Sequence, residues 1–290
     1  MINLILSILF TTSLGVILKL FERNKLDVFQ AIVFNYLSCV VTGILVQHSV
    51  PDYFAYSGEG WFRYAVILGC SFIFFFNVMG YIVKKMGITV MFVANKLSLV
   101  IPVGAAFFIF NEEVTALKIA GICIALLAVL FTSIKSDESK HSFSGQQLFW
   151  PILLFVGSGM NDTLVKYAQA FHLRDIDNAP FNITIFSAAS VAGAIIFSVM
   201  LIQKKSKLNF KSIVGGLLLG VPNYFSMHFL IKALSIPDYG SSIIFPLNNI
   251  GIVIASSLIA FILFHEKLSK LNIAGIALAV LAIVIIAFAV

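Results

Sequence analysis

The sequence predicts an all-α integral membrane protein in which ten transmembrane helices form two inverted five-helix repeats. Three observations lead to this prediction: an apolar composition, ten apolar stretches of spanning length, and a second half that repeats the first. Hydrophobic residues make up 60% of the 290 residues and charged residues only 11%. Soluble domains carry about 25% charged residues, so most of this chain is expected to lie in lipid.

The ten predicted helices follow from length and hydropathy. A spanning helix needs about 20 predominantly apolar residues. The stretches that meet this requirement are Ile2–Leu20, Val28–Gln47, Trp61–Lys84, Ile88–Phe110, Thr115–Ile134, Leu148–Ala170, Ala179–Gln203, Ser212–Ala233, Gly240–Phe264 and Ser269–Val290. No basic segment precedes the first stretch, so we expect it to be a retained helix rather than a cleaved signal.

The internal repeat is clearest where residues 106–128 align with residues 260–282, because twelve of these 23 pairs are identical. In both copies an apolar stretch ends in an acidic residue, Glu112 or Glu266, and the next stretch opens on Ile-Ala-Gly. We expect repeats over residues 1–134 and 148–290, joined by a polar linker at 135–147. Five crossings per repeat force the second copy to insert upside down, as in many secondary transporters.

The net charge of +6 comes from lysines and arginines in short links, as membrane topology demands, and does not indicate a nucleic-acid partner. Twelve of these residues follow odd-numbered spans and four lie near even-numbered links. The positive-inside rule therefore places the odd links in the cytoplasm, and both termini on the same, outer side. We expect a multi-pass protein of the plasma (inner) membrane.

Enzymatic and metal chemistry have no support in the sequence. Cys39, Cys70 and Cys123 lie far apart in apolar stretches, as expected for small buried side chains. The sequence contains no P-loop, His-Glu-x-x-His or Gly-x-Ser-x-Gly motif. We therefore expect no catalytic residue, no cofactor and no metal.

The paired units, the acidic residue that closes the fourth helix of each, and the following Ile-Ala-Gly resemble the drug/metabolite transporter superfamily, and within it the EamA-type ten-helix members. The resemblance covers nearly the whole chain and is most specific around Glu112 and Glu266. It implies a basket of ten helices around a central substrate cavity, and transport, often export, of small metabolites such as amino acids. Pro102 and Pro246 do not align with each other, so the family's substrate does not carry over.

Charged side chains inside the spans are the first candidates for binding, because each costs about 2.5–3.5 kcal/mol on insertion scales and needs a partner or a function. Asn95 and Lys96 lie well inside the fourth span, where Lys96 can hold a substrate carboxylate or phosphate, or neutralise a buried acid. Asp162 lies in the sixth span and shares a helix face with Lys166. It can bind a substrate ammonium group or the coupling proton, or form a salt bridge with Lys166 or Lys96.

Amides and aromatic side chains complete the candidate substrate site. Asn249 is the repeat twin of Asn95, and it adjoins Asn248 just after Pro246, which loosens the helix by removing a backbone donor. The remaining candidates, from spans three and eight, are Asn77, Tyr81, Asn223, Tyr224 and His228. They can bind the substrate or frame the cavity, and a histidine can also relay protons or satisfy a neighbouring group.

Two further features indicate scaffold roles. Glu112 and Glu266 are expected to cap or brace the next helix, whose N-terminus favours negative charge. The motif Gly216-x-x-x-Gly220 permits close helix packing, either within the chain or in a homodimer.

Together these features favour a secondary transporter, and more specifically an exporter, of a small polar metabolite such as an amino acid. It would work by alternating access, with Asp162 as the proton-coupling candidate. The expected partners are a small-molecule substrate and the lipid bilayer. The alternative is a non-transporting scaffold or subunit of a membrane complex.

Overall fold

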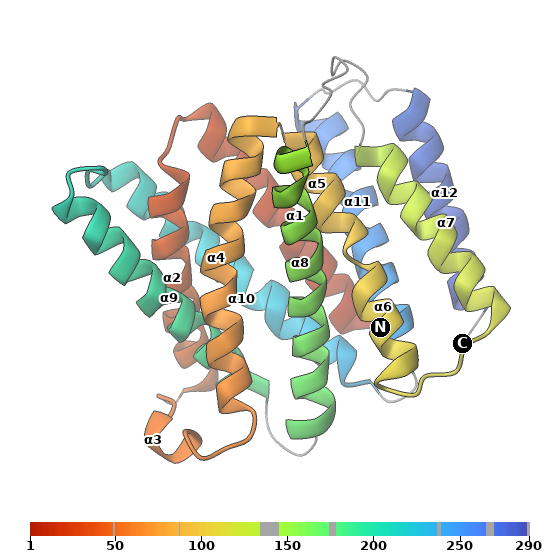
Figure 1. The fold of residues 1–290 in the computed structure, drawn as a ribbon, viewed down its shortest axis with the longest axis horizontal. Helices are drawn as coiled ribbons and strands as arrows, with labels where there is room; N and C mark the ends of the chain where they lie inside the picture. The colour runs from red at the N-terminus through yellow and green to blue at the C-terminus, as the bar shows by residue number, and fades with distance from the viewer. Residues whose placement is uncertain are drawn as a thin grey trace. The chain divides into compact units, whose positions relative to one another are not determined.

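The computed structural model describes residues 1–48, 50–86, 88–133, 145–173, 178–236, 239–264 and 270–288 (Figure 1). Within these residues the secondary structure is helical and includes no strand. The helices are α1 (Ile2–Arg23), α2 (Val28–Gln47), α3 (Tyr53–Tyr56), α4 (Phe62–Met86), α5 (Ile88–Leu97), α6 (Val100–Phe108), α7 (Ala116–Ser133), α8 (Gly145–His172), α9 (Asn178–Ile202), α10 (Phe210–Leu234), α11 (Ser241–Phe264) and α12 (Lys270–Ala287).

Among the described residues, six helices are long and apolar enough to cross a membrane. These spans are Val28–Gln47, Phe62–Ile82, Leu148–His172, Asn178–Ile202, Phe210–Leu234 and Ser241–Ile259. Shorter apolar helical segments occupy Ile2–Leu18, Ala94–Phe108, Ala116–Phe131 and Ile273–Ile286. The chain is therefore a multi-pass membrane protein, made of helices that satisfy their own backbone hydrogen bonds in lipid.

Local capping explains why α2 has the bounds that hydropathy predicts. Asp27 has an extended backbone and its carboxylate accepts a hydrogen bond from the Gln30 backbone N–H at 3.1 Å. This bond satisfies one of the donors that a helix start leaves without a partner. At the other end, His48 adopts the left-handed conformation with φ of 53°, which stops the helix.

The predicted span Ile88–Phe110 contains two helices rather than one. Pro102 explains the break between α5 and α6, because it lacks an N–H and its ring clashes with the carbonyl four residues earlier, at Ser98. Local bonds stabilise the interrupted turn: Ser98 Oγ donates to the Asn95 carbonyl at 2.5 Å, and the Ile101 N–H donates to the Ser98 carbonyl at 2.9 Å. The break therefore lies directly after the first pair of candidate residues.

The chain forms two compact units, and each draws on both halves of the sequence. Unit 1 comprises Met1–Phe74 with Leu164–Ser235, and unit 2 comprises Phe75–Thr163 with Ile236–Val290. Two helices, α4 and α8, begin in one unit and end in the other. The predicted repeats over residues 1–134 and 148–290 concern relatedness of sequence and remain a prediction.

Unit 1 is held together by close packing of α10 on α2. A Cβ atom on Gly216 would collide with the carbonyl of Ala31, and one on Gly220 would collide with the α2 backbone and with Ser38. Ser38 Oγ donates to the Leu217 carbonyl at 2.7 Å, so a hydroxyl bonds the facing backbone directly. The motif Gly216-x-x-x-Gly220 is thus a packing seam within the chain.

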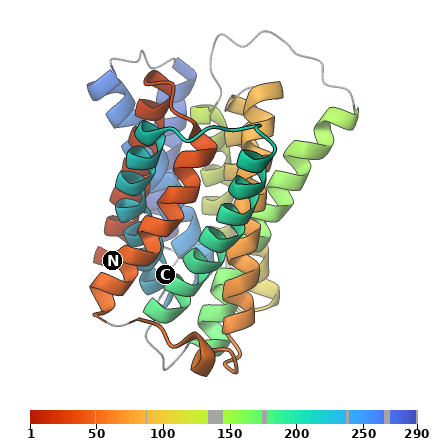
Figure 2. The same ribbon diagram turned by 90° about the vertical axis from the view of Figure 1, so that its left-hand side faces the viewer.

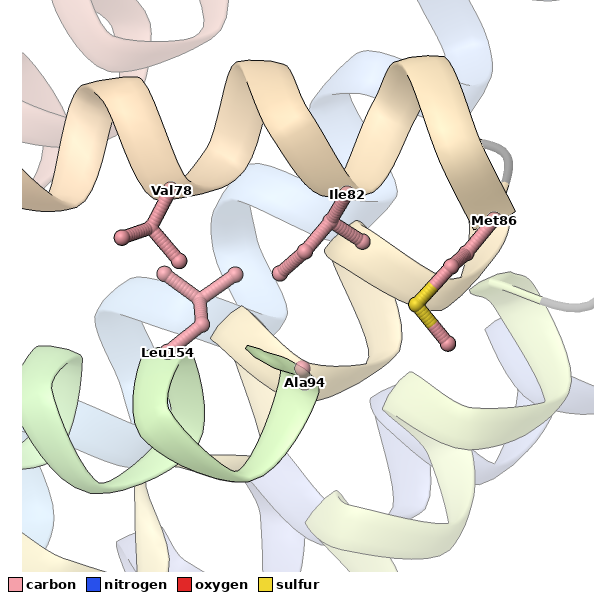
Figure 3. Close-up of a cluster of buried hydrophobic side chains, with 5 residues drawn as sticks. All are labelled: Val78, Ile82, Met86, Ala94 and Leu154. Atoms are coloured by element: carbon pink, nitrogen blue, oxygen red, sulfur yellow. The ribbon is translucent and has the colours of Figure 1, made fainter. Parts of the chain in front are cut away.

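Unit 2 contains an apolar cluster at which α4, α5 and α8 meet (Figure 3). Its buried side chains are Val78, Ile82, Met86, Ala94 and Leu154. Elsewhere in unit 2, α7 lies alongside α12 (Figure 1), where a Cβ atom on Gly121 would collide with Ile286. The cluster joins α5 and α8 beside Asn95, which follows Ala94, and about two turns before Asp162.

Candidate functional site

The candidate site of unit 2 is built on α5, α8 and α11. Near the end of α5, the Lys96 Nζ atom donates a hydrogen bond to Asn249 Oδ1 in α11 at 3.2 Å. The Asn249 Nδ2 group donates in turn to the Phe245 carbonyl, one turn earlier in α11, at 3.2 Å. The amide is therefore oriented with its oxygen toward the ammonium group.

Asn95 joins α5 to α8, because its Nδ2 group donates to Ser158 Oγ at 3.0 Å. Ser158 lies between Gly157 and Gly159, and the two glycines allow α8 to approach its neighbours closely. A Cβ atom on Gly159 would collide with Ile101, in the first turn of α6. The small residues of α8 thus pack against the break between α5 and α6.

Asp162 lies one turn beyond Ser158 on the same face of α8. Asp162 and Lys96 are close enough for their opposite charges to interact. Opposite charges that attract one another offset part of the cost of removing each from water. The side chains of Lys96, Asp162, Asn95 and Asn249 are of intermediate exposure, between those of the core and those of the surface.

Asn248 precedes Asn249 on α11 and is a further candidate hydrogen-bond acceptor. Its side chain is 7% exposed, and its Oδ1 atom has no hydrogen-bond partner among the described residues. A buried acceptor without a donor is rare in folded proteins and needs an explanation. A donor on a bound solute would provide one. We call Asn95, Lys96, Asp162, Asn248 and Asn249 the Lys96 cluster.

Asn77 and Tyr81 share one face of α4 in unit 2, as their spacing predicts, and that face is exposed. The Tyr81 ring lies 4.7 Å from the Trp150 ring of α8, measured between centroids. The structure thus packs Tyr81 on the surface of the helix pair.

The candidates from span eight lie on α10 in unit 1. The Asn223 Nδ2 group donates to Asn35 Oδ1 in α2 at 3.1 Å. Tyr224 and His228 are buried, and their rings stack with centroids 5.6 Å apart. This group consists of amides and aromatic rings that lie against α2.

Lys166, which the sequence offers as a partner of Asp162, is anchored in unit 1. Its Nζ atom donates to Gln169 Oε1 at 2.8 Å and to the Leu234 carbonyl at 2.9 Å. Leu234 ends α10, and the C-terminal end of a helix favours positive charge. These contacts give Lys166 a structural role.

Glu112 caps a helix, but not the next one along the chain. Its Oε1 atom accepts bonds from the Ser241 N–H and Oγ, both at 2.6 Å. Its Oε2 atom accepts bonds from the Ser242 N–H at 3.0 Å and Oγ at 2.5 Å. The expectation of a cap on the following helix is thus corrected, since the serines begin α11. Glu266 lies outside the described residues.

Burial by itself raises the pKa of the Glu112 carboxyl, but the hydrogen bonds from Ser241 and Ser242 outweigh burial and hold the pKa below its ordinary value. A Cβ atom on Gly240 would collide with the carboxylate, so a larger residue there would displace the Glu112 side chain. The carboxylate is therefore kept ionised and fixed at the start of α11.

Sequence reasoning missed Asn35, Ser158 and the serine pair before span nine. Asn35 is a single amide in an apolar run, and Ser158 is a small residue in a helix, so neither pattern is unusual. The triplet Gly240-Ser241-Ser242 carries a detectable signal, since serine hydroxyls are typical caps of helix starts. Its partner Glu112 is more than 120 residues away, and spacing does not predict such pairs.

No protein-family model matches the chain. A protein of Haemophilus influenzae, described as uncharacterized, is 28% identical over 287 residues, which are 97% of this chain and 96% of that protein. A protein known from its crystal structure superposes with a TM-score of 0.75 over 99% of this chain and 96% of that chain, at 11% sequence identity. The second likeness shows that the two chains share a fold.

Proposed function

We propose that this chain is a secondary transporter of the drug/metabolite type that exports a small zwitterionic metabolite, such as an amino acid, across the plasma (inner) membrane. One observation carries the proposal. Lys96 and Asp162 carry opposite charges that interact, and Lys96 follows Asn95 on α5 and bonds to the amide of Asn249, within a unit that is otherwise mostly apolar. Ionisable groups at membrane depth are costly, and they are typical of substrate and ion pathways.

The chemistry of the Lys96 cluster matches the two ends of such a solute. An ammonium group has three donors, and Asn249 accepts one of those of Lys96. Lys96 therefore binds the solute carboxylate through a charge-assisted bond. Asp162 binds the solute ammonium group, and Asn248 Oδ1 accepts a further hydrogen bond from it.

Proton coupling follows from the double use of Asp162. The solute ammonium group and a proton both bind to this carboxylate, so each lowers the affinity for the other. Competition of this kind leads to exchange: a proton moves inward as the solute moves outward. The solute is released when Asp162 is protonated.

The inverted ten-helix plan is part of the proposal, and pairs of packing contacts within the units support it. In unit 1, α1 bonds to α10 through Ser7 Oγ and the Ser226 carbonyl, and in unit 2, α8 packs on α4 around Leu154. These are equivalent pairs if spans one to five correspond to spans six to ten. The packing of α2 on α10 likewise corresponds to that of α9 on α4, where a Cβ atom on Gly69 would collide with Ala188.

Reconstitution in proteoliposomes tests the proposal. We expect the purified protein to move at least one radiolabelled amino acid. Transport should be faster when a pH gradient drives protons in the direction opposite to that of the amino acid. Lys118 is half-buried like Lys96, and its Nζ donates to the Glu113 carbonyl, so it provides a matched control: we expect Lys118→Met to transport normally. Transport of no amino acid, with or without a gradient, contradicts the proposal.

A further inference from the structure

A second polar group, in unit 1, is sealed from water. Asn182, in the second turn of α9, is 0% exposed, and neither its Oδ1 nor its Nδ2 atom has a hydrogen-bond partner among the described residues. An exposure of zero leaves no space for a water molecule at the amide. Burying an amide without any hydrogen bond is unfavourable. The Asn182 amide would therefore gain hydrogen bonds in another conformation or from a ligand.

The neighbours of Asn182 on α9 are apolar contacts that offer the amide no partner. Phe181 packs edge-on against Trp61, with ring centroids 6.1 Å apart. Ile183 lies where a Cβ atom on Gly43 would be. The Phe186 ring, one turn further along α9, lies 6.3 Å from the Tyr224 ring. The helix is thus held on both sides of Asn182.

Residues 51–61, which we call the α3 lid, contact α9 on both sides of Asn182, at Phe181 and at Ser187. Figures 1 and 2 show α3 beyond the ends of α2 and α4. Tyr53 Oη lies 2.9 Å from Ser187 Oγ of α9, and the Tyr56 ring lies 5.3 Å from the Trp61 ring. Trp61 therefore lies between the lid helix and Phe181.

Trp61, like Asn182, has a buried polar atom without a hydrogen-bond partner among the described residues. It is 1% exposed, and its Nε1 atom has no hydrogen-bond partner in the described part of the chain. Buried tryptophan N–H groups usually find an acceptor. The Asn182 amide and the Trp61 indole N–H thus both lack partners among the described residues, and Phe181 precedes Asn182 in the chain and contacts the Trp61 ring.

We propose that the α3 lid is a gate of unit 1, and that Asn182 is a solute contact that the gate covers in the described conformation. When Trp61 moves with the lid, the Asn182 amide and the indole N–H face an aqueous path. Together they offer donors and an acceptor but no charge. They therefore suit an uncharged polar group of the solute, a hydroxyl or a carboxamide.

The inference rests on the proposed transport function for the identity of the ligand, but the opening of the lid is testable without any solute. Asn182→Cys is prepared in a chain that also carries Cys39→Ala, Cys70→Ala and Cys123→Ala, because these cysteines are free. Ile185→Cys is the matched control, since Ile185 is also 0% exposed and lies on the same helix. Both are treated in membranes with a charged methanethiosulfonate reagent.

We expect the Asn182→Cys protein to react about tenfold faster than the Ile185→Cys protein, because only the first position opens to water. Adding Trp61→Ala is expected to accelerate the first reaction and not the second. Equal rates at the two positions overturn the proposal. A rate difference that Trp61→Ala leaves unchanged overturns the role of the lid.

Asn182→Leu provides a second measurement. It removes the amide without leaving a void, so the melting temperature rises if the amide lacks a partner in the resting state. We expect that rise together with slower transport of serine and glutamine than of alanine, relative to the parent protein. Unchanged selectivity among these three contradicts the solute contact. If the parent protein transports nothing, the proposed function fails, while the labelling result stands.

Discussion

Lys166 in unit 1 and Lys96 in unit 2 differ in their hydrogen-bond partners. Lys166 in unit 1 bonds to Gln169 and to the last carbonyl of α10, so its charge completes a helix end. Lys96 in unit 2 bonds to the side-chain amide of Asn249 and interacts with the charge of Asp162. A lysine fixed on the backbone has a structural role, whereas one held by side chains that can exchange partners is suited to binding. The comparison favours Lys96, in unit 2, as the lysine of the proposed binding site.

The largest effect is expected from exchanging the two lysines for methionine. Lys96→Met removes the ammonium group that we propose as the contact of the solute carboxylate, and we expect transport to fall about 100-fold, equivalent to about 2.7 kcal/mol. Lys166→Met is expected to lower the melting temperature while leaving the transport rate per folded molecule nearly unchanged. Initial rates in proteoliposomes check both. A similar transport loss in both variants breaks the comparison.

The helix caps give the next largest difference. Glu112→Gln replaces an ion that accepts four bonds, and we expect a loss of about 2 kcal/mol of stability. Asp27→Asn, in unit 1, is the matched control, because Asp27 caps its own helix and asparagine caps nearly as well. Thermal unfolding in detergent measures both variants.

Acid sensitivity sharpens the same prediction. The pKa of Glu112 is lower in the folded state than its ordinary value. Its stabilisation is therefore present above that ordinary value and is lost as the pH falls through the folded-state pKa. The stability gap between the parent protein and Glu112→Gln should shrink over this acid range. A gap that is constant with pH would falsify the assignment of the cap.

Asp162→Asn tests the proton coupling that we propose for Asp162 in unit 2. The amide does not take up a proton at Asp162, so the proton gradient no longer drives transport, and we expect gradient-driven export to fall about tenfold. Solute exchange without a gradient should be less affected, because it needs no proton. Measuring both modes in the same vesicles separates coupling from binding. Gradient-driven export at the parent rate rules out Asp162 as the coupling residue.

The smallest effects are expected at the serines. Ser38→Ala in unit 1 and Ser158→Ala in unit 2 each remove one hydrogen bond between helices, worth about 0.6 kcal/mol in a membrane protein. The predicted difference lies in function: only Ser158 orients a residue of the Lys96 cluster, so only its variant should transport more slowly. Equal transport rates for the two variants count against Asn95 as a binding residue.

Hydropathy predicted the position of each long helix, because an apolar stretch of spanning length has few alternatives. It did not predict the break in Ile88–Phe110, although Pro102 provides the physical cause. Hydropathy does not register the loss of a backbone donor at Pro102, because proline leaves the apolar character of the stretch unchanged.

The site was less accessible to sequence reasoning. The repeat alignment matches Asn249 with Asn95 in sequence. In the structure the hydrogen-bond partner of Asn249 is Lys96. The bonds of Asn95 to Ser158 and of Glu112 to Ser241 join residues that are far apart in the chain. Such pairs depend on which helices pack together, and this information is absent from helix periodicity.

The shared composition of the units has a consequence for biogenesis. Unit 1 needs residues 164–235 to complete what residues 1–74 begin, so α1 and α2 lack their packing partner α10 until synthesis has passed Leu234. Unit 2 is completed later than unit 1, because α11 and α12 are synthesised last. A chain cut in the middle would leave both units unfinished, and two separately expressed halves would have to find each other in the bilayer before either becomes resistant to membrane proteases.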